Sequence, residues 1–300
     1  GRIVYSVVVQ PGESFRLTKF LAYHSSSGAP MEELCARAER TLNRNLGIGR
    51  EELFAEHAQR VEDFWRRSDV EIEGDPGVQQ AVRFNLFQLL QATARVEGYG
   101  VPAKGLTGQG YEGHYFWDAE IYVLPFLIYT APRIARSLLR FRYGMLDKAR
   151  ARAKELGHRG ALFPWRTING EEASAYYAAG TAHYHIDADI AYALKKYVDV
   201  TDDLGLLYDG GAEIMVETAR LWADLGCYSE DLDGAFAIHG VTGPDEYTAI
   251  VNNNRYTNMM ARENLRAAVW AVEFVKTVQP EIFARLVDDT GLDLSELEAW

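Results

Sequence analysis

The helical repeat that dominates this chain is clearest in residues 203–225, DLGLLYDGGAEIMVETARLWADL. Its large apolar side chains recur at helical spacing and fall close to one face of a helix. They are Leu206, Ile214, Leu221, Trp222 and Leu225. Charged residues on the remaining surface, such as Glu217 and Arg220, are spaced so that they can pair along the same helix. The stretch therefore predicts an amphipathic helix that packs on a largely helical core.

Most of the chain after residue 74 repeats this pattern and carries few strand signals. Gly74-Asp75-Pro76 predicts the start of the region, because Asp caps helices and Pro fits their first turn. Before it, segments 30–45 and 50–67 predict two further helices. In the main region we expect helices at 78–96, 118–129, 132–156, 184–200, 203–225 and 256–278.

The first 24 residues follow a different pattern. IVYSVVV is apolar and β-branched, Gln10-Pro11-Gly12-Glu13 is typical of a turn, and SFRLTKFLAYH partly alternates. We therefore expect strand, turn and strand. An isolated hairpin is barely stable in water, so these residues are interpreted as the last strands of a larger sheet. Residues 25–28, SSSG, read as a short linker.

Composition excludes several classes of protein. The 300 residues are 48% apolar, enough for a real core, and carry a formal net charge of −12, which argues against a nucleic-acid partner. We interpret the basic run at 133–159 as the solvated face of a helix. The sequence contains neither a membrane-spanning run nor the zones of a signal peptide, and Cys35 and Cys227 suit a reducing compartment. We therefore expect a cytoplasmic protein without a membrane partner.

Three long polar and aromatic loops, at 98–117, 157–183 and 226–255, connect the expected helices. Loops of this length in a compact domain are usually functional or disordered, and their aromatic content argues against disorder. The last loop contains IHGVTGPDEYTAIVNNNRYTN at 238–258, with Glu246 in an adjacent acidic pair. Glycoside cleavage needs a carboxylic acid, and Glu246, partly shielded from water by Pro244 and Tyr247, could supply it. The alternative is that the acidic pair belongs to a simple polar turn. Asn252 to Asn254 could bind sugar hydroxyls or hold the loop.

The first loop leads into GLTGQGYEGHYFWDAEIYVLP at 105–125. Its glycines lack the following Lys-Ser/Thr and the parallel β-α-β pattern of a phosphate-binding loop, which excludes a nucleotide site. Two readings of Asp118 stay open. It could simply cap a helix, or it could form a sugar-binding pair with Trp117, in which the ring bounds the pocket and the carboxylate grips hydroxyls.

The second loop gives FPWRTINGEEASAYYAAGTAHYHIDADIAYAL at 163–194. Its two histidines and two aspartates could suggest a metal, but nothing resembles a His-Glu-x-x-His helix, and we predict no metal or cofactor. We expect instead a pocket wall of polar and aromatic side chains. It consists of Trp165, Arg166, Glu171, Glu172 and Tyr177. A Ser or Cys nucleophile is excluded because neither type has a motif partner.

These three blocks, in this order and spacing, resemble glycoside hydrolase family 65, the inverting phosphorylases of maltose, trehalose, kojibiose and nigerose. The resemblance covers essentially the whole chain. It implies a mainly α fold in which residues 75–300 form the first part of an (α/α)6 barrel. Residues 25–74 correspond to linker helices, and residues 1–24 to the end of an N-terminal β-sandwich.

The resemblance also implies an activity. Glu246 resembles the family's general acid, Trp117 and Asp118 resemble residues that hold the glucosyl unit, and Trp165 to Glu172 fall where the acceptor pocket is shaped. The expected reaction is phosphorolysis of an α-linked glucose disaccharide to β-glucose 1-phosphate and glucose, with inorganic phosphate as co-substrate. A homodimer is expected on the same ground. A hydrolase of the same family and a non-catalytic sugar-binding relative are the alternatives.

The chain departs from the family pattern in three ways. Family members are more than twice this length, and neither their Lys-Gln-Ala-Asp block nor their phosphate-binding loop is found in this sequence. Asn252 stands where many relatives have Asp. We therefore expect a fragment that carries the acid and part of the glucosyl subsite. Its PWRTINGEEAS segment is closer to kojibiose and trehalose enzymes than to maltose ones.

Overall fold

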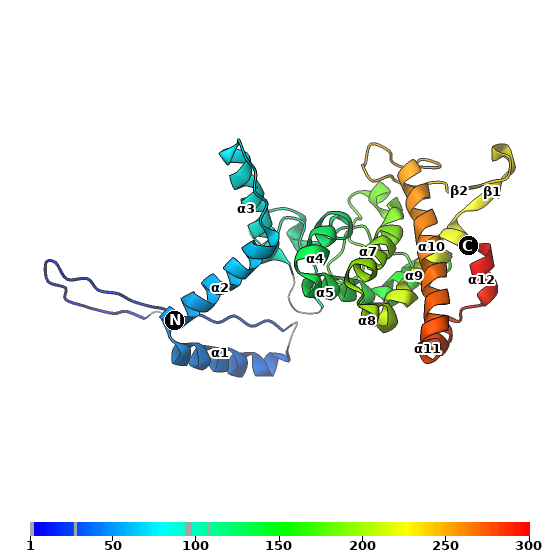
Figure 1. Ribbon diagram of the computed structural model, residues 1–300. Coiled ribbons are helices and arrows are strands. Elements are labelled where there is room, and N and C mark those ends of the chain that lie inside the picture. Colours follow the sequence, from blue (N-terminus) through cyan, green and yellow to red (C-terminus); the bar gives the residue numbers. More distant parts are fainter. Residues whose placement is uncertain (1–2, 27–28, 94–97, 107) are drawn as a thin grey trace. The chain divides into compact units, whose positions relative to one another are not determined.

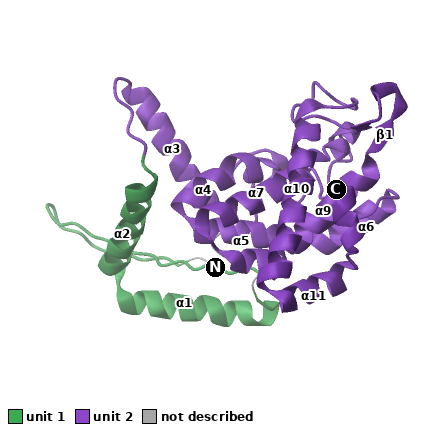
Figure 2. Ribbon diagram, turned by 45° about the vertical axis from the view of Figure 1, so that its right-hand side comes forward, with its two compact units in different colours: residues 1–69 green, residues 70–300 purple. Residues whose placement is uncertain are grey.

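The computed structural model describes residues 3–26, 29–93, 98–106 and 108–300. Within it the chain forms two compact units, residues 1–69 and residues 70–300 (Figure 2). The domain boundaries predicted at 24/25 and 74/75 stay predictions. They separate a β-sandwich, linker helices and a barrel, whereas the two units of the structure are divided only by how compactly each one packs.

The first unit contains two helices. The 3-10 turn η1 (Met31–Glu33) leads into α1 (Leu34–Ile48), and α2 (Arg50–Ser68) follows after Gly49. Gly49 has a φ of 87°, a left-handed conformation that separates the two helices. The two helices predicted at 30–45 and 50–67 are therefore confirmed to within a few residues.

In the N-terminal segment the predicted strands are not formed, and the assignment of residues 1–24 to the end of a β-sandwich stays a prediction. Residues 3–24 run out and back around a turn at Pro11–Gly12, where Glu13 N–H donates to the Gln10 carbonyl, but no strand occurs among the described residues of this segment (Figure 1). Ile3, Val8 and Tyr23 are 77%, 88% and 88% exposed. The physical reason is that two extended segments alone offer no further strand or helix on which their apolar side chains could be buried.

The regular secondary structure of the second unit is almost entirely helical (Figure 1). Its helices are α3 (Pro76–Ala92), η3 (Ala119–Val123), α4 (Leu124–Thr130), α5 (Pro132–Tyr143), α6 (Leu146–Glu155), α7 (His185–Thr201), α8 (Leu204–Leu206), η5 (Leu207–Gly211), α9 (Ala212–Leu225), α10 (Arg255–Val278), α11 (Pro280–Thr290) and α12 (Leu294–Ala299). Three single turns, η2 (Tyr111–Gly113), η4 (Ala178–Ala182) and η6 (Glu230–Leu232), lie in the loops. Strands β1 (Cys227–Ser229) and β2 (Ala235–Ala237) form an antiparallel hairpin in which Tyr228 pairs with Phe236.

The core of this unit lies where α7 and α9 both pack along α10. Ile190, Ile214 and Val272 are fully buried there. One polar pair in the core is the Trp222 indole N–H, which donates to Asn264 Oδ1 at 3.0 Å. Among the described residues, no helix combines the length and the apolar character needed to cross a bilayer.

Two of the predicted helices are divided. The segment 132–156 breaks at Gly144 into α5 and α6, and 203–225 begins as α8 and η5 before α9 continues. In η5, Gly210 has a φ of 124°, and a Cβ placed there would lie 2.3 Å from the Tyr143 ring. The helical repeat predicts where apolar faces lie, but breaks of this kind depend on distant neighbours. The hairpin, α11 and α12 were not predicted.

Backbone hydrogen bonds join the three long loops, each of which leads into a helix. The first loop precedes η3, the second precedes α7, and the third precedes α10. Tyr115 and Thr167 form an antiparallel bridge between the first and second loops. Thr242 N–H donates to the Ala182 carbonyl at 2.9 Å and so ties the third loop to the second. The loops therefore form one connected layer.

Candidate active site

A cavity of about 380 Å³ opens where the three loops meet. All three loops contribute to its wall, and so do four of the residues predicted from the sequence. Its lining residues are Ala103, Lys104, Tyr111, Phe116, Trp117, Asp118, Tyr122, Trp165, Pro244 and Glu246. Aromatic rings and carboxylates around a concave surface are the side chains expected of a sugar site.

Glu246 reaches this cavity because the third loop is held as a tight, bonded turn. Val241 and Val251 form an antiparallel bridge, and Gly243 N–H donates to the Thr248 carbonyl at 2.9 Å. A Cβ at Gly243 would lie 2.3 Å from Thr248 Oγ1, so a larger residue there would displace the Thr248 side chain.

The three asparagines of this loop serve to hold it. Asn252 Oδ1 accepts from Gly240 N–H and Asn253 Oδ1 accepts from Ile238 N–H, both at 3.1 Å. Asn254 caps α10 by accepting from Thr257 N–H. Of the two roles considered from the sequence, hydroxyl binding or holding the loop, the hydrogen bonds of the structure show the second.

The carboxylate of Glu246 is open to the cavity. Its side chain is 56% exposed, and its Oε1 lies 4.0 Å from His183 Nε2. Pro244 lines the same cavity, but Tyr247 is 100% exposed and does not shield the acid, contrary to expectation. The adjacent Asp245 instead accepts from Tyr247 N–H at 3.0 Å and stabilises the turn.

Trp117 and Asp118 line the same cavity at the start of η3. Trp117 is 9% exposed and packs edge-on against the His185 ring, with centroids 4.9 Å apart. Asp118 occupies the N-cap position of η3 without a side-chain capping bond, and it is exposed to the cavity. Loss of water around the carboxyl raises the pKa of Asp118, and the charges of Glu120 and Glu246 act in the same direction. Simple capping therefore does not explain this side chain.

A buried ion pair supports this corner of the site, and the sequence reasoning missed it. Glu120 and Arg142 are both fully buried, with contacts of 2.8 and 2.9 Å. Tyr115 donates its hydroxyl proton to Glu120 Oε1 at 2.7 Å, and burial raises the pKa of Tyr115. These residues fix the turn that presents Trp117. A Glu two positions after Asp118 was the available signal, but its partner lies 22 residues further along the chain.

Glu172 holds the second loop and does not line the cavity. Its carboxylate accepts from Trp165 N–H at 2.9 Å, from Arg166 N–H at 3.1 Å and from the Ser174 hydroxyl at 2.7 Å. Arg152 pairs with the same group. The charge of Glu172 is therefore used to fix the backbone that carries Trp165, whose ring does line the cavity.

Glu171 points elsewhere. Its side chain is 71% exposed and pairs with Lys148 at 3.1 Å, and it is absent from the described wall of the cavity. The substrate-binding roles expected for Glu171 and Glu172 stay predictions, and the structure brings neither side chain to the cavity beside Glu246.

The histidines and aspartates considered as metal ligands bind protein groups. His185 Nδ1 and Asp189 Oδ2 are 2.7 Å apart, and the Tyr256 hydroxyl donates to Asp189 Oδ1 at 2.7 Å. Asp187 Oδ1 accepts from Phe163 N–H at 2.8 Å. Within the described ranges, three or more His, Cys, Asp or Glu residues are nowhere arranged to hold a metal ion.

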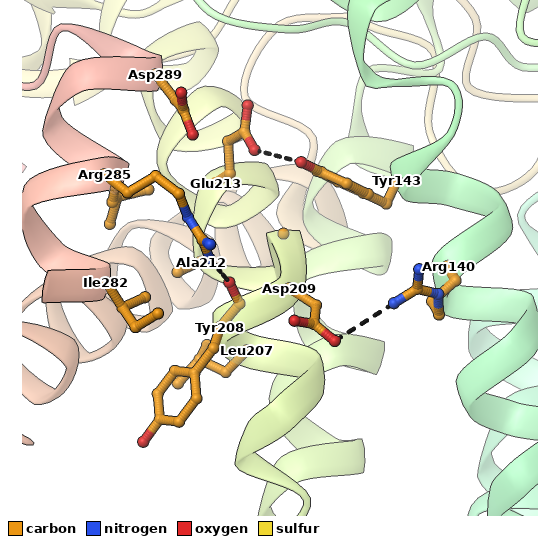
Figure 3. Close-up of a pocket in the computed structure, with 12 residues that line it drawn as sticks. Arg140, Tyr143, Leu207, Tyr208, Asp209, Ala212, Glu213, Ile282, Arg285 and Asp289 are labelled. Atoms are coloured by element: carbon orange, nitrogen blue, oxygen red, sulfur yellow. Dashed lines mark hydrogen bonds and ion pairs between the residues drawn. The ribbon is translucent and has the colours of Figure 1, made fainter. Parts of the chain in front are cut away.

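A second cavity, of about 400 Å³, lies between α5, η5 and α11 (Figure 3). Its charged groups are largely occupied by one another: Arg140 pairs with Asp209, and the Tyr143 hydroxyl donates to Glu213. Arg285 donates to the Tyr208 carbonyl at 2.7 Å. None of its described lining residues is shared with the first cavity, and we place the candidate active site in the first.

Comparison with known proteins shows the family of this chain. Residues 83–300 match the glycosyl hydrolase family 65 central catalytic domain. An alpha,alpha-trehalose phosphorylase of Thermoanaerobacter brockii is 48% identical over 100% of this chain and 39% of its own length. A kojibiose phosphorylase of Halothermothrix orenii is 42% identical over 83% of this chain and 34% of its own length.

A solved structure from the human microbiome, provisionally assigned as a kojibiose phosphorylase, superposes with a TM-score of 0.81 at 32% identity. It matches 90% of this chain and 35% of its own. The chain therefore spans less than two fifths of the length of these relatives. The prediction of a mainly α fold that forms part of an (α/α)6 barrel is confirmed. The chain belongs to glycosyl hydrolase family 65.

Proposed function

We propose that the full-length protein containing this chain phosphorolyses an α-linked glucose disaccharide with inversion, giving β-glucose 1-phosphate and glucose. The observation that carries the proposal is the convergence of Glu246, Trp117 and Asp118 on one cavity. The relatives named as trehalose and kojibiose phosphorylases support the choice of phosphate as co-substrate.

The proposal gives each of these residues a role. Glu246 protonates the glycosidic oxygen, because its carboxylate is exposed and lines the cavity. Trp117 forms an apolar wall against the glucosyl ring, and Asp118 accepts hydrogen bonds from its hydroxyls. In an inverting reaction the nucleophile enters from the face opposite the acid, and here phosphate takes the place of the base-activated water. Trp165 bounds the side on which the leaving sugar lies.

The test uses the full-length protein with kojibiose, trehalose, maltose and nigerose, each with and without phosphate, followed by anomer-resolved NMR. We expect β-glucose 1-phosphate from one of these sugars and only when phosphate is present. Free β-glucose formed equally with and without phosphate would replace the proposal with a hydrolase. Sugar binding without any product would replace it with a binding protein.

A further inference from the structure

Tyr111 lines the candidate active site, and its backbone is held in an unfavourable conformation. Tyr111 and Glu112 have φ angles of 55° and 44°, in the left-handed region that residues with a side chain rarely adopt. Such a conformation persists only where the surrounding contacts enforce it, and it is frequent where proteins hold a ligand. Tyr111 has no part in the reaction proposed for the site.

Contacts with the second loop hold this strained turn. Arg166 is buried, forms an ion pair with Glu112, and donates to the Tyr111 carbonyl at 3.5 Å. His114 N–H donates to the same carbonyl at 2.8 Å. Arg166 is itself placed by Glu172, whose carboxylate accepts from its backbone N–H at 3.1 Å. The turn that carries Tyr111 is therefore fixed to the second loop.

The aromatic side chains that line the cavity form two groups. Trp117 packs against Tyr122, with ring centroids 5.8 Å apart. In the second group, Tyr111 meets Phe116 edge-on at 5.3 Å between centroids, and Phe116 meets Trp165 in the same way at 5.5 Å. Tyr111 is therefore grouped with Trp165, the ring that bounds the side of the leaving sugar.

The surroundings of the Tyr111 ring suit a sugar. Tyr111 is exposed, and the Lys104 ammonium lies 5.5 Å from the centroid of its ring. Both residues line the cavity. A sugar presents an apolar face and a rim of hydroxyls, and an aromatic ring with a charged donor beside it can bind both.

We propose that Tyr111 is the platform for the leaving sugar, and that the pair between Arg166 and Glu112 holds it in place. The Tyr111 ring packs on the apolar face of this sugar, on the side that Trp165 bounds, while Trp117 packs on the glucosyl unit. The inference rests on the proposed function, because it requires a disaccharide to lie across the cavity. Tyr111 transfers no proton and is a specificity-determining residue.

The test compares two donors in the full-length protein. A disaccharide places a sugar on the leaving side, whereas α-glucosyl fluoride with phosphate fills only the glucosyl side. Tyr111→Ala should lower kcat/KM on the disaccharide about ten-fold, because loss of an aromatic contact costs about that factor. The fluoride reaction should change much less. Tyr111→Phe keeps the ring and should stay near the parent on both donors.

The reverse reaction gives a second readout. With β-glucose 1-phosphate as donor and glucose as acceptor, Tyr111→Ala should raise the KM for glucose about ten-fold and leave the KM for the donor unchanged. Tyr228→Ala is the matched control, because Tyr228 is also exposed and meets Phe236 edge-on at 5.4 Å, outside the described lining of this cavity. Equal losses on both donors, or a parent-like KM for glucose, would overturn the role of Tyr111.

Glu112→Ala tests the pair that holds the platform. Glu112 is exposed and is not among the described lining residues, so its loss acts on the sugar only through the turn. It should raise the KM for glucose, and adding it to Tyr111→Ala should have no further effect. Asp199→Ala, which breaks an exposed pair with Lys195, is its control. A parent-like KM in Glu112→Ala would overturn the holding role.

The parent enzyme distinguishes the two proposals. If it forms no β-glucose 1-phosphate from any disaccharide supplied with phosphate, the proposed function falls and this inference falls with it. If it does form this product, and Tyr111→Ala matches the parent on the disaccharide and in the reverse reaction, only the role of Tyr111 falls.

Discussion

Glu246 and Asp245 are adjacent carboxylates with different surroundings. Glu246 faces the cavity, whereas Asp245 accepts a backbone hydrogen bond within its own turn. In Glu246→Gln, turnover of an unactivated disaccharide should fall by about 10²- to 10⁴-fold, because the leaving oxygen loses its proton donor. The dissociation constant for the sugar should change little. Asp245→Asn removes the same charge one position away and should keep most of the activity. Steady-state kinetics of both variants measure the difference, and similar losses in the two would contradict the assignment of Glu246 as the acid.

Asp187 offers a prediction about pH and stability. It is fully buried, and burial raises its pKa well above the usual range, since the Phe163 N–H and the Arg152 charge only partly offset the loss of water. The folded protein therefore holds this proton at a pH where the unfolded chain has released it. The free energy of unfolding must then fall as pH rises from the unfolded pKa, about 3.9, toward the folded one.

Asp187→Asn removes this titration and keeps the oxygen that accepts from Phe163 N–H. Urea unfolding from pH 4 to pH 8 should show a shallower decline of stability than in the parent. Asp147, whose side chain is 96% exposed, supplies the control, because its replacement by Asn should leave the slope unchanged. A parent-like slope in Asp187→Asn would show that Asp187 is ionised in the folded protein.

Single elements show how far local pattern determines structure. The repeat in 203–225 predicts a helix, but its charged side chains, expected on an open face, are buried together with the apolar ones in α9, while the predicted bounds 256–278 agree with α10 to within one residue. The division of that segment at η5 was not predicted, because it depends on Tyr143, more than sixty residues earlier in the chain. A local pattern contains no information about such a neighbour.

Gly210 allows this dependence to be measured. A Cβ at Gly210 would overlap the Tyr143 ring at 2.3 Å, whereas Gly234, also with positive φ, has nothing within 4 Å. Both Ala variants carry the backbone cost of about 1 kcal/mol, and Gly210→Ala adds a clash of roughly 1–3 kcal/mol. Thermal unfolding should therefore place the Gly210→Ala midpoint clearly below that of Gly234→Ala. Equal midpoints would mean that Tyr143 moves aside freely.

At the scale of the whole molecule, the site also shows that a local sequence pattern does not predict contacts with distant residues. Trp117, Asp118, Trp165 and Glu246 were predicted together from three separate blocks, and they do line one cavity. Glu171 and Glu172 were grouped with them because they are close in sequence, yet their side chains turn toward Lys148 and toward the loop backbone. Which way a loop carboxylate points depends on the hydrogen bonds that close the loop, and the sequence pattern does not contain them.

The length of the relatives leads to a prediction about activity. Residues 1–300 correspond to 34–39% of the length of the named phosphorylases. Expressed alone, residues 1–300 should turn over disaccharide at least about 10²-fold more slowly than the full-length protein, because a donor subsite without its remaining ligands loses positioning. Phosphate-dependent product release, measured at equal protein concentration, checks this. Comparable rates would show that the acid loop and the Trp117 wall suffice.

The exposed N-terminal arms also affect how the chain behaves in concentrated solution. Ile3 to Val9 is a run of β-branched and aromatic residues, interrupted only by Ser6, with no charge and no proline, and its side chains lie open to solvent. Segments of this composition are prone to cross-β assembly when they are left uncovered. A preparation of residues 1–300 should therefore scatter light increasingly with time and concentration, and a lysine at Val8 should act as a gatekeeper that delays the fibres.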